Sequence, residues 1–205
     1  MWLQFVADEQ RRAAQQRAKG AGMDIGIVTD LAVGAQAGDD PVEFYLQVLA
    51  DKTGVLIAAA AQYGAMFSGC DERTVEVLGR YGELVGLVFQ LSDDILDIAS
   101  EAETSGKTPG TDLREGVTTL PTFYVNASSD PADARLKALL ARPLTDDAEH
   151  AEALELLRAH PAMEQARAHT LTTAREAAAL IDELGEGEVQ DALKEVPLSV
   201  ATRSA

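Results

Sequence analysis

A run of nine residues, 89–97, places three carboxylates and one amide in sequence that is otherwise mostly apolar. The side chains concerned are Gln90, Asp93, Asp94 and Asp97. Read as a helix, they fall at i, i+3, i+4 and i+7 and share one face. Like charges this close repel one another, and burial would raise their pKa values. A divalent cation would neutralise them, and a ligand set made only of oxygen atoms favours Mg²⁺.

Two lysine-bearing segments could complete such a site. The first is the polar step Asp51-Lys52-Thr53 at the start of an apolar run, and the second is Gly106-Lys107, which precedes Asp112. A metal held by carboxylates can bridge to phosphate oxygens while lysines neutralise the remaining charge. Together these elements predict a diphosphate site that could ionise an allylic diphosphate by stabilising the leaving group. Taken singly, each has a plainer interpretation as a solvated acidic helix face or an ordinary surface lysine.

A carbocation produced at such a site needs dry, apolar walls without strong nucleophiles. Leu84, Val88, Phe89 and the run Val55–Ala61 could supply them.

Composition narrows the class of protein. The chain has 205 residues and a net charge of −17, from 34 acidic and 17 basic side chains. This charge argues against nucleic acid as a partner, because a phosphate backbone needs a basic footprint. We expect no signal peptide, because the sequence turns polar at Asp8, and no integral membrane segment, because Gln62 and Gly64 interrupt the apolar run. The expected location is cytoplasmic.

The pattern of start and stop signals predicts an all-α protein in one helical domain over residues 1–205. Asp40-Pro41 should begin a helix that continues to about Phe67, and Asp71 should begin another that ends near Ser100. Residues 101–117 have the composition of a long loop. Further helices are expected over residues 2–18, 118–126, 131–142, 146–159, 161–184 and 186–203.

These motifs resemble those of trans-type polyprenyl diphosphate synthases, the polyprenyl synthetase family, most strongly over residues 41–125. Residues 89–97 resemble the second aspartate-rich motif of that family, residues 106–116 the loop that follows it, and Asp51-Lys52-Thr53 its Lys-Thr step. The resemblance implies a helical bundle of the isoprenoid synthase type that is shortened at its N-terminus. Residues 1–40 hardly resemble the family.

The resemblance also implies roles for individual residues. Asp93 and Asp97 would ligate Mg²⁺, and Asp94 would assist them or be oriented by a neighbouring group. Lys52 and Lys107 would bind the allylic diphosphate.

Thr53 and Gln90 would lie near the ionising C–O bond, where their oxygens could stabilise positive charge, and would act with Lys52 in catalysis. The implied reaction is ionisation of an allylic prenyl diphosphate, condensation with isopentenyl diphosphate and loss of a proton.

We find no first aspartate-rich motif in this sequence, and three hypotheses follow. The chain could be a prenyltransferase subunit or shortened synthase, completed by another chain. It could be a non-catalytic homologue that binds prenyl diphosphate or a partner synthase, or the product of a truncated reading frame. The expected assembly is a homodimer or a heteromer with a full-length synthase.

Overall fold

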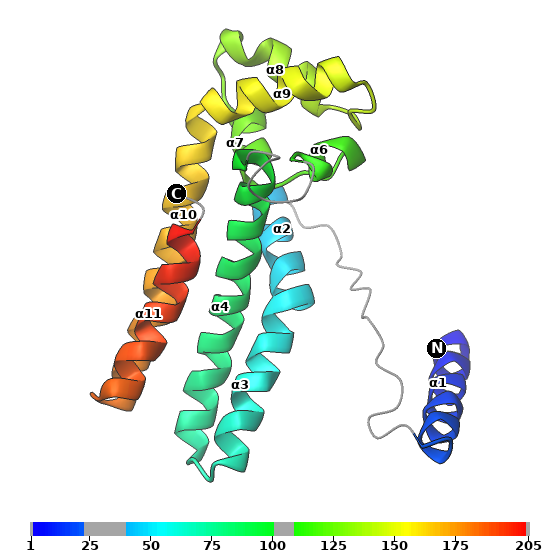
Figure 1. Ribbon diagram of the computed structural model, residues 1–205, viewed down its shortest axis with the longest axis vertical. Coiled ribbons are helices and arrows are strands. Elements are labelled where there is room, and N and C mark those ends of the chain that lie inside the picture. Colours follow the sequence, from blue (N-terminus) through cyan, green and yellow to red (C-terminus); the bar gives the residue numbers. More distant parts are fainter. Residues whose placement is uncertain (1, 23–39, 101–108, 204–205) are drawn as a thin grey trace. The chain divides into compact units, whose positions relative to one another are not determined.

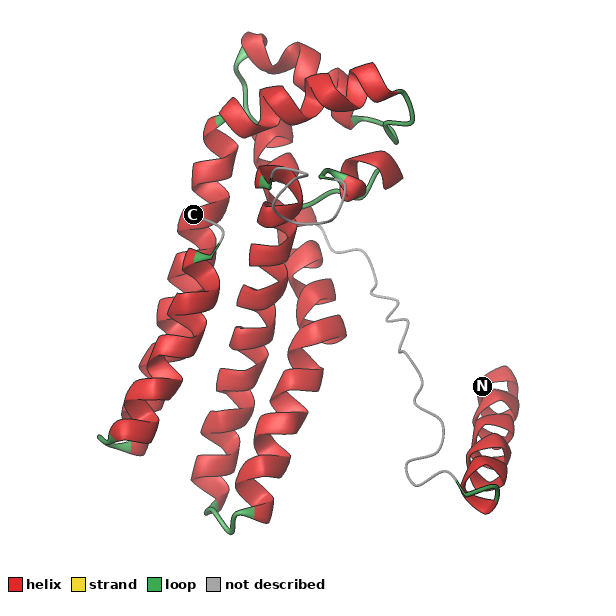
Figure 2. Ribbon diagram, viewed as in Figure 1, coloured by secondary structure: helices red, strands yellow, loops and turns green. Residues whose placement is uncertain are grey.

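The computed structural model describes residues 2–22, 40–100 and 109–203. Contacts divide the chain into two units, Met1–Ala32 and Val33–Ala205, and each is described by itself. The first unit contains helix α1, Trp2–Gly20. No strand occurs in the described residues, so the predicted all-α class is confirmed (Figure 2). The prediction of one domain over the whole chain stays a prediction.

The second unit is built around two long helical segments that run side by side (Figure 1). The first consists of α2 (Pro41–Leu49), the π-helical turn η1 (Ala50–Gly54) and α3 (Val55–Phe67), and the second is α4 (Glu72–Ala99). The remaining elements are α6 (Thr111–Glu115), α7 (Leu120–Ala127), η2 (Pro131–Asp133), α8 (Ala134–Leu140), α9 (Asp147–Ala159), α10 (Pro161–Leu180), η3 (Ile181–Leu184) and α11 (Glu188–Thr202).

The two long segments begin where their capping residues predict. The Asp40 carboxylate accepts a hydrogen bond from the Val42 N–H at 2.8 Å, and Pro41 occupies the first helical position. The Asp71 carboxylate accepts one from the Thr74 N–H at 2.7 Å. Each cap satisfies backbone donors that have no partner within the helix, which fixes the start of the element.

A π-helical turn interrupts the first long segment, which the sequence had predicted as one continuous helix. It covers Ala50–Gly54 and therefore contains Lys52 and Thr53. Here the segment crosses α4 so closely that a Cβ atom at Gly86 would lie 2.7 Å from the Cα of Gly54. Single π turns of this kind are frequent at functional sites in helices.

The apolar face of α4 anchors the aspartate-bearing helix in the core. Leu91, Ile95 and Ile98 are buried and recur at i, i+4 and i+7. They pack with Leu120 and Val125 of α7 and with apolar residues of α8 to α10. Burying a side chain of this size contributes about 1.5–3 kcal/mol, so this face fixes how the neighbouring polar stripe points.

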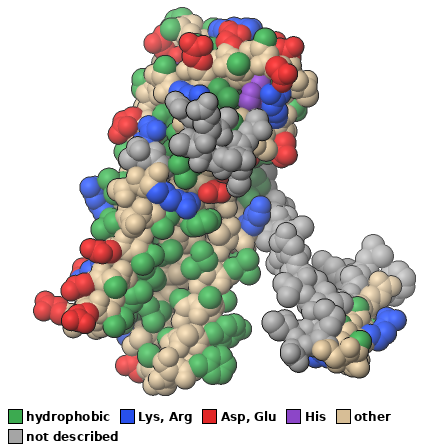
Figure 3. All heavy atoms as spheres, viewed as in Figure 1, with side chains coloured by type: hydrophobic (Ala, Val, Ile, Leu, Met, Phe, Trp, Pro, Cys, Tyr) green, Lys and Arg blue, Asp and Glu red, His purple; other side chains and the backbone are tan. Residues whose placement is uncertain are grey.

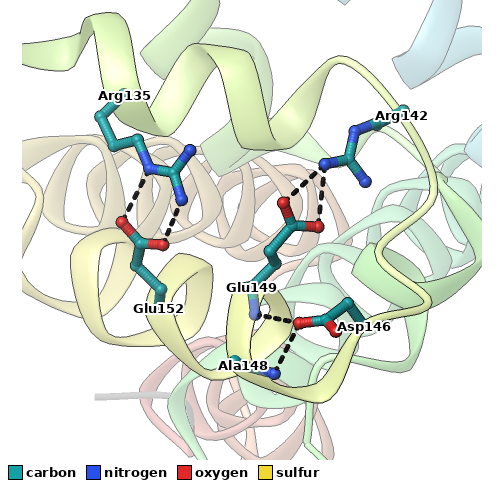
Figure 4. Close-up of polar contacts among 6 residues, drawn as sticks. All are labelled: Arg135, Arg142, Asp146, Ala148, Glu149 and Glu152. Carbon is teal, nitrogen blue, oxygen red and sulfur yellow. Dashed lines mark hydrogen bonds and ion pairs between the residues drawn. The ribbon is translucent and has the colours of Figure 1, made fainter.

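The α8–α9 hairpin is held on its surface by polar contacts (Figure 4). Arg135 forms a bidentate ion pair with Glu152. One nitrogen of Arg142 donates to both carboxylate oxygens of Glu149, at 2.7 and 2.8 Å. The Asp146 carboxylate caps α9 through two backbone N–H groups. The exposed ion pairs are worth little individually, so we assign the start of α9 mainly to its cap.

One face of α3 is apolar and exposed. Leu56 and Phe67 are 63% and 91% exposed, and Val55, Tyr63 and Met66 are also exposed. Figure 3 shows hydrophobic side chains gathered over the half of this unit that contains α3, α4 and α11. The exposed residues Val55, Leu56, Tyr63, Met66 and Phe67 are called the α3 apolar face below. Contiguous exposed apolar side chains often mark an interaction surface.

The helical run Pro41–Phe67 is long and apolar enough to cross a membrane, by length and composition alone. The interruption that the sequence suggested at Gln62 and Gly64 lies within this helix and does not end it, and the expectation of no integral membrane segment stays a prediction. One such helix is weak evidence for a membrane span, since buried helices of soluble proteins satisfy the same criterion.

Candidate functional site

Asp94 lies at the centre of the candidate site. Its side chain is 8% exposed and receives two hydrogen bonds: the Tyr45 hydroxyl donates to Oδ2 at 2.5 Å and Gln90 Nε2 donates to Oδ1 at 3.0 Å. Burial is the main cause that raises the pKa of Asp94, while the two hydrogen bonds lower it. Burial also raises the pKa of Tyr45, and the neighbouring Asp94 charge adds to this effect. Asp94 is thus a buried carboxylate with both oxygens engaged.

Thr53 joins this group from the π-helical turn. Its hydroxyl donates to Gln90 Oε1 at 3.3 Å, and Gln90 in turn donates to Asp94. The contact depends on the close crossing of Gly54 and Gly86, because a larger residue at either position would push the two helices apart. Thr53, Gln90, Asp94 and Tyr45 therefore form one hydrogen-bonded chain between the two long helical segments.

Asp93 is exposed and faces the end of α11. Its Oδ1 lies 3.4 Å from the Arg203 guanidinium, in an ion pair whose side chains are both partly open to solvent. Arg203 is positioned by a second contact, because its guanidinium lies 4.5 Å above the centre of the Phe89 ring. It also donates to the Phe89 carbonyl at 3.3 Å. The Arg203 guanidinium and the Asp93 carboxylate thus form an ion pair at the surface, next to the hydrogen-bonded residues around Asp94.

Asp97 is half-buried and holds the short helix α6. Its Oδ1 and Oδ2 accept hydrogen bonds from the N–H groups of Thr111 and Asp112, each at 3.2 Å. Its backbone carbonyl accepts the Gly110 N–H at 2.7 Å. Asp97 therefore serves as an anion at the start of α6, in the region that the sequence predicted as loop. Residues 101–108 of that region lie outside the described residues.

Asp112 brings a fourth carboxylate close to the stripe. It is half-buried, and its pKa is raised to about 6, first by burial and then by the charges of Asp94 and Asp97. A carboxylate surrounded by other carboxylates is easier to protonate, or to neutralise with a cation, than one in water.

Magnesium requires oxygen ligands, and the stripe offers only these. Among the described residues, however, no three acidic, histidine or cysteine side chains are arranged to hold one metal ion. Both oxygens of Asp94 and both oxygens of Asp97 accept hydrogen bonds, whereas Asp93 is exposed and pairs with Arg203. The carboxylate oxygens suit Mg²⁺ by type, and the described side chains do not by themselves complete a site for it.

The two predicted lysines are placed differently. Lys52 is exposed, and it forms no ion pair with any carboxylate in the described part of the chain. Its ammonium group is therefore open to bind an anion. Lys107 lies outside the described residues.

The predicted apolar wall residues pack in different parts of the described structure. Val88 is completely buried and packs with Ala174 and Ala201, so it does not face a pocket. Leu84 packs in a separate core cluster, whereas Phe89 is 40% exposed. A large hollow of about 550 Å³ lies between α7 and the start of α10, and none of the predicted site residues lines it.

Three residues join the site that were not among the predicted site residues: Tyr45, Asp112 and Arg203. Tyr45 could have been found as a hydroxyl on the helix that carries Thr53, about two turns earlier. Asp112 follows the Gly-Lys segment and was noticed there without a role. Nothing near Arg203 in sequence signals its contact with Asp93.

The chain belongs to the polyprenyl synthetase family, whose sequence model matches residues 6–157. The match extends closer to the N-terminus than the resemblance recognised from the motifs, which began at residue 41.

Similar proteins carry prenyl diphosphate synthase names. Nonaprenyl diphosphate synthase of Mycobacterium tuberculosis is 54% identical over 134 residues, which cover 65% of this chain and 40% of that protein. Heptaprenyl diphosphate synthase component 2 of Geobacillus stearothermophilus is 36% identical over 80% of this chain and 51% of its own length.

Solved structures share the fold. Geranylgeranyl pyrophosphate synthase from Corynebacterium glutamicum, complexed with calcium and isoprenyl diphosphate, has a TM-score of 0.74 and 34% identity. The match covers 98% of this chain and 59% of that chain. The polyprenyl synthase from Caulobacter crescentus CB15, in the same kind of complex, has a TM-score of 0.73 and 29% identity. The predicted isoprenoid synthase bundle is confirmed, and the chain spans about half the length of these relatives.

Proposed function

We propose that this chain acts in prenyl transfer and supplies the part of the site that ionises an allylic prenyl diphosphate for condensation with isopentenyl diphosphate. The observation that carries the proposal is the hydrogen-bonded chain from Thr53 through Gln90 and Asp94 to Tyr45. It places polar oxygens beside an accessible carboxylate, Asp93, in a chain of the polyprenyl synthetase family.

Each residue has a role in this proposal. Asp93 and Asp97 would hold Mg²⁺, and Asp94 would orient Gln90. The cation would draw negative charge from the departing diphosphate and so stabilise it as a leaving group. Lys52, and with it Lys107, would neutralise the remaining phosphate charge.

Thr53 and Gln90 would direct oxygen atoms toward the developing carbocation. Because they are fixed before the reaction, they would stabilise charge without having to reorganise. The proton lost after condensation would pass to the diphosphate, the strongest base that the reaction itself provides.

The alternative is a homologue that binds a prenyl diphosphate or a partner synthase without turnover. The family match and the names of the relatives support prenyl transfer rather than this alternative. An activity assay distinguishes the two functions, because only prenyl transfer forms a lengthened prenyl diphosphate.

We further propose a homodimer or a heteromer with a full-length synthase, in the cytoplasm. The α3 apolar face supports this assembly, since a second chain would remove its side chains from water. The name of the Geobacillus relative, component 2, also points to assembly with another chain. Leu56→Glu should weaken the assembly, as measured by light scattering after gel filtration.

The test of function uses isopentenyl diphosphate with an allylic primer and Mg²⁺, with the chain alone and mixed with a full-length synthase. We expect the chain to contribute turnover in one of these conditions, and Asp93→Ala to abolish that contribution without changing the melting temperature in the absence of Mg²⁺. Melting is then repeated with Mg²⁺ and pyrophosphate. Stabilisation without product would support the binding protein, and neither product nor stabilisation would reject both functions.

A further inference from the structure

A histidine on α9 reaches the turn that Asp97 holds. The side chain of His150 is buried, with 5% of the residue exposed, and its Nε2 lies 2.9 Å from the Gly110 carbonyl oxygen. Because a carbonyl only accepts hydrogen bonds, Nε2 carries the proton and donates it. Gly110 has φ +72, and a Cβ atom there would lie 2.6 Å from Nε2. The imidazole is thus packed directly on the backbone of a glycine.

Gly110 connects this histidine to Asp97. The Gly110 N–H donates to the Asp97 carbonyl, and the next two N–H groups donate to the Asp97 carboxylate. One peptide segment is therefore bound by α4 through its N–H groups and by α9 through its carbonyl. Displacement of Gly110 would move both donors that orient the Asp97 oxygens.

Other contacts between α6 and the hairpin lie further along the chain. The Leu144 N–H donates to the Leu113 carbonyl at 3.0 Å, and Arg114 pairs with Asp147 at 2.7 Å. Both act at the end of α6, where Asp97 makes no contact. The hydrogen bond from His150 connects α9 to the residue that precedes α6.

We propose that His150 is a positioning residue that fixes the carboxylate of Asp97 through Gly110. The inference rests on the proposed function, in which Asp97 binds Mg²⁺. His150 itself touches neither the cation nor the substrate. Groups that orient metal ligands in this way commonly change metal affinity by about 10- to 100-fold when they are removed.

The decisive variants separate the hydrogen bond from packing. His150→Gln keeps an N–H donor, whereas His150→Leu fills the space without one, and His150→Phe serves as a second apolar variant if Leu does not fold. His169→Leu is the matched control, since it removes a hydrogen bond to the Tyr124 hydroxyl that has no link to α6. Urea unfolding confirms that each variant is folded.

The first measurement is amide hydrogen exchange at Thr111 and Asp112, which needs no ligand. We expect exchange about 10-fold faster in His150→Leu, because loss of one hydrogen bond has about that effect on a local opening equilibrium. His150→Gln and His169→Leu should stay close to the wild type. Unchanged exchange in both apolar variants, or equal acceleration in His150→Gln, would overturn the proposal.

The second measurement is calorimetric titration with Mg²⁺ and inorganic pyrophosphate. The dissociation constant should rise at least about 10-fold in His150→Leu and recover in His150→Gln. If the wild type binds and Asp97→Ala does not, an unaffected His150→Leu overturns this inference alone. If the wild type binds no pyrophosphate with Mg²⁺, the metal-binding role of Asp97 fails and this inference fails with it, whereas the product assay decides the proposed function separately.

Discussion

The hydroxyl of Tyr45 donates to the buried carboxylate of Asp94 at 2.5 Å, across 49 residues of sequence. The contact joins α2 to α4 at the level of the aspartate stripe. This contact explains how Asp94 can be buried although no oppositely charged side chain in the described part of the chain pairs with it. Hydrogen bonds from Tyr45 and Gln90 replace part of the hydration that Asp94 loses, and they act against the rise in its pKa that burial causes.

Tyr45→Phe should therefore destabilise the protein in a pH-dependent way. At pH 7.5 we expect the free energy of unfolding to fall by about 2 kcal/mol, as for a lost hydrogen bond to a charged group. Without that bond the pKa of Asp94 rises further. A carboxyl whose pKa is raised on folding loses stability as pH increases through that pKa, so the deficit should be smaller at pH 5.

Urea unfolding at the two pH values measures this difference. Tyr63→Phe is the control, because Tyr63 is 59% exposed and its hydroxyl makes no hydrogen bond in the described part of the chain. An equal deficit at both pH values would show that the Tyr45 hydroxyl acts independently of the ionisation of Asp94.

The parts of the fold that were predicted depend on local sequence. The helical stripe of Gln90, Asp93, Asp94 and Asp97 follows from periodicity, and the helix starts at Asp40 and Asp71 follow from caps within three residues. These features need no knowledge of what the helix packs against. They were sufficient for the all-α class and for the residues that carry the motif.

The parts that were missed depend on contacts between distant residues. Asp97 binds the Asp112 N–H 15 residues away, and Arg203 reaches Asp93 across 110 residues. Helix α6 has only five residues and depends on Asp97 as an anion at its start. A short segment with two glycines and a proline nearby has no local signal for a helix. Tertiary contact therefore decides its structure.

The crossing of Gly54 and Gly86 should tolerate no larger side chain. In Gly86→Ala the new Cβ atom would lie 2.7 Å from the Cα of Gly54, which is backbone and cannot rotate away. We expect a loss of about 1–3 kcal/mol, the usual cost of overpacking, and separation of Thr53 from Gln90. Denaturant unfolding measures the first effect and a crystal structure the second.

Gly64→Ala, in the same pair of helices, should stabilise the protein, whereas Gly86→Ala should destabilise it. Gly64 lies within α3, and a Cβ atom there would meet nothing within 4 Å. Alanine should stabilise the helix by about 0.5–1 kcal/mol, because it lowers the entropy of the unfolded chain. A stabilising Gly86→Ala would mean that the two helices are not in close contact.

The α8–α9 hairpin should depend more on its cap than on its ion pairs. Asp146→Ala leaves two N–H groups at the start of α9 without their acceptor and should cost about 1 kcal/mol. Arg142→Ala removes an exposed pair with Glu149 and should cost at most about 0.5 kcal/mol. Raising the salt concentration should reduce only the second effect, which thermal unfolding at two ionic strengths can show.

Asp112→Asn should stabilise the protein at neutral pH and not in acid. The pKa of Asp112 is raised from 3.8 to about 6 on folding, so the folded protein binds more protons than the unfolded chain between these values. Its unfolding free energy therefore falls as pH rises through this range, and the full cost is present above about pH 6. Because Asp112 is only partly buried and is screened by water, we expect asparagine to recover about 1 kcal/mol at pH 7.5. Near pH 4 the gain should disappear.

The matched control is Glu155→Gln, which changes the net charge equally at an exposed position of α9. Reduced repulsion over the whole acidic chain would stabilise both variants alike, whereas the local crowding of carboxylates predicts a gain for Asp112→Asn alone. Mg²⁺ separates the two explanations further. If Asp93 and Asp97 bind the cation, its charge lowers the cost of ionised Asp112, and the advantage of asparagine at pH 7.5 should decrease as Mg²⁺ is added. An advantage that persists unchanged at saturating Mg²⁺ would show that the cation binds elsewhere.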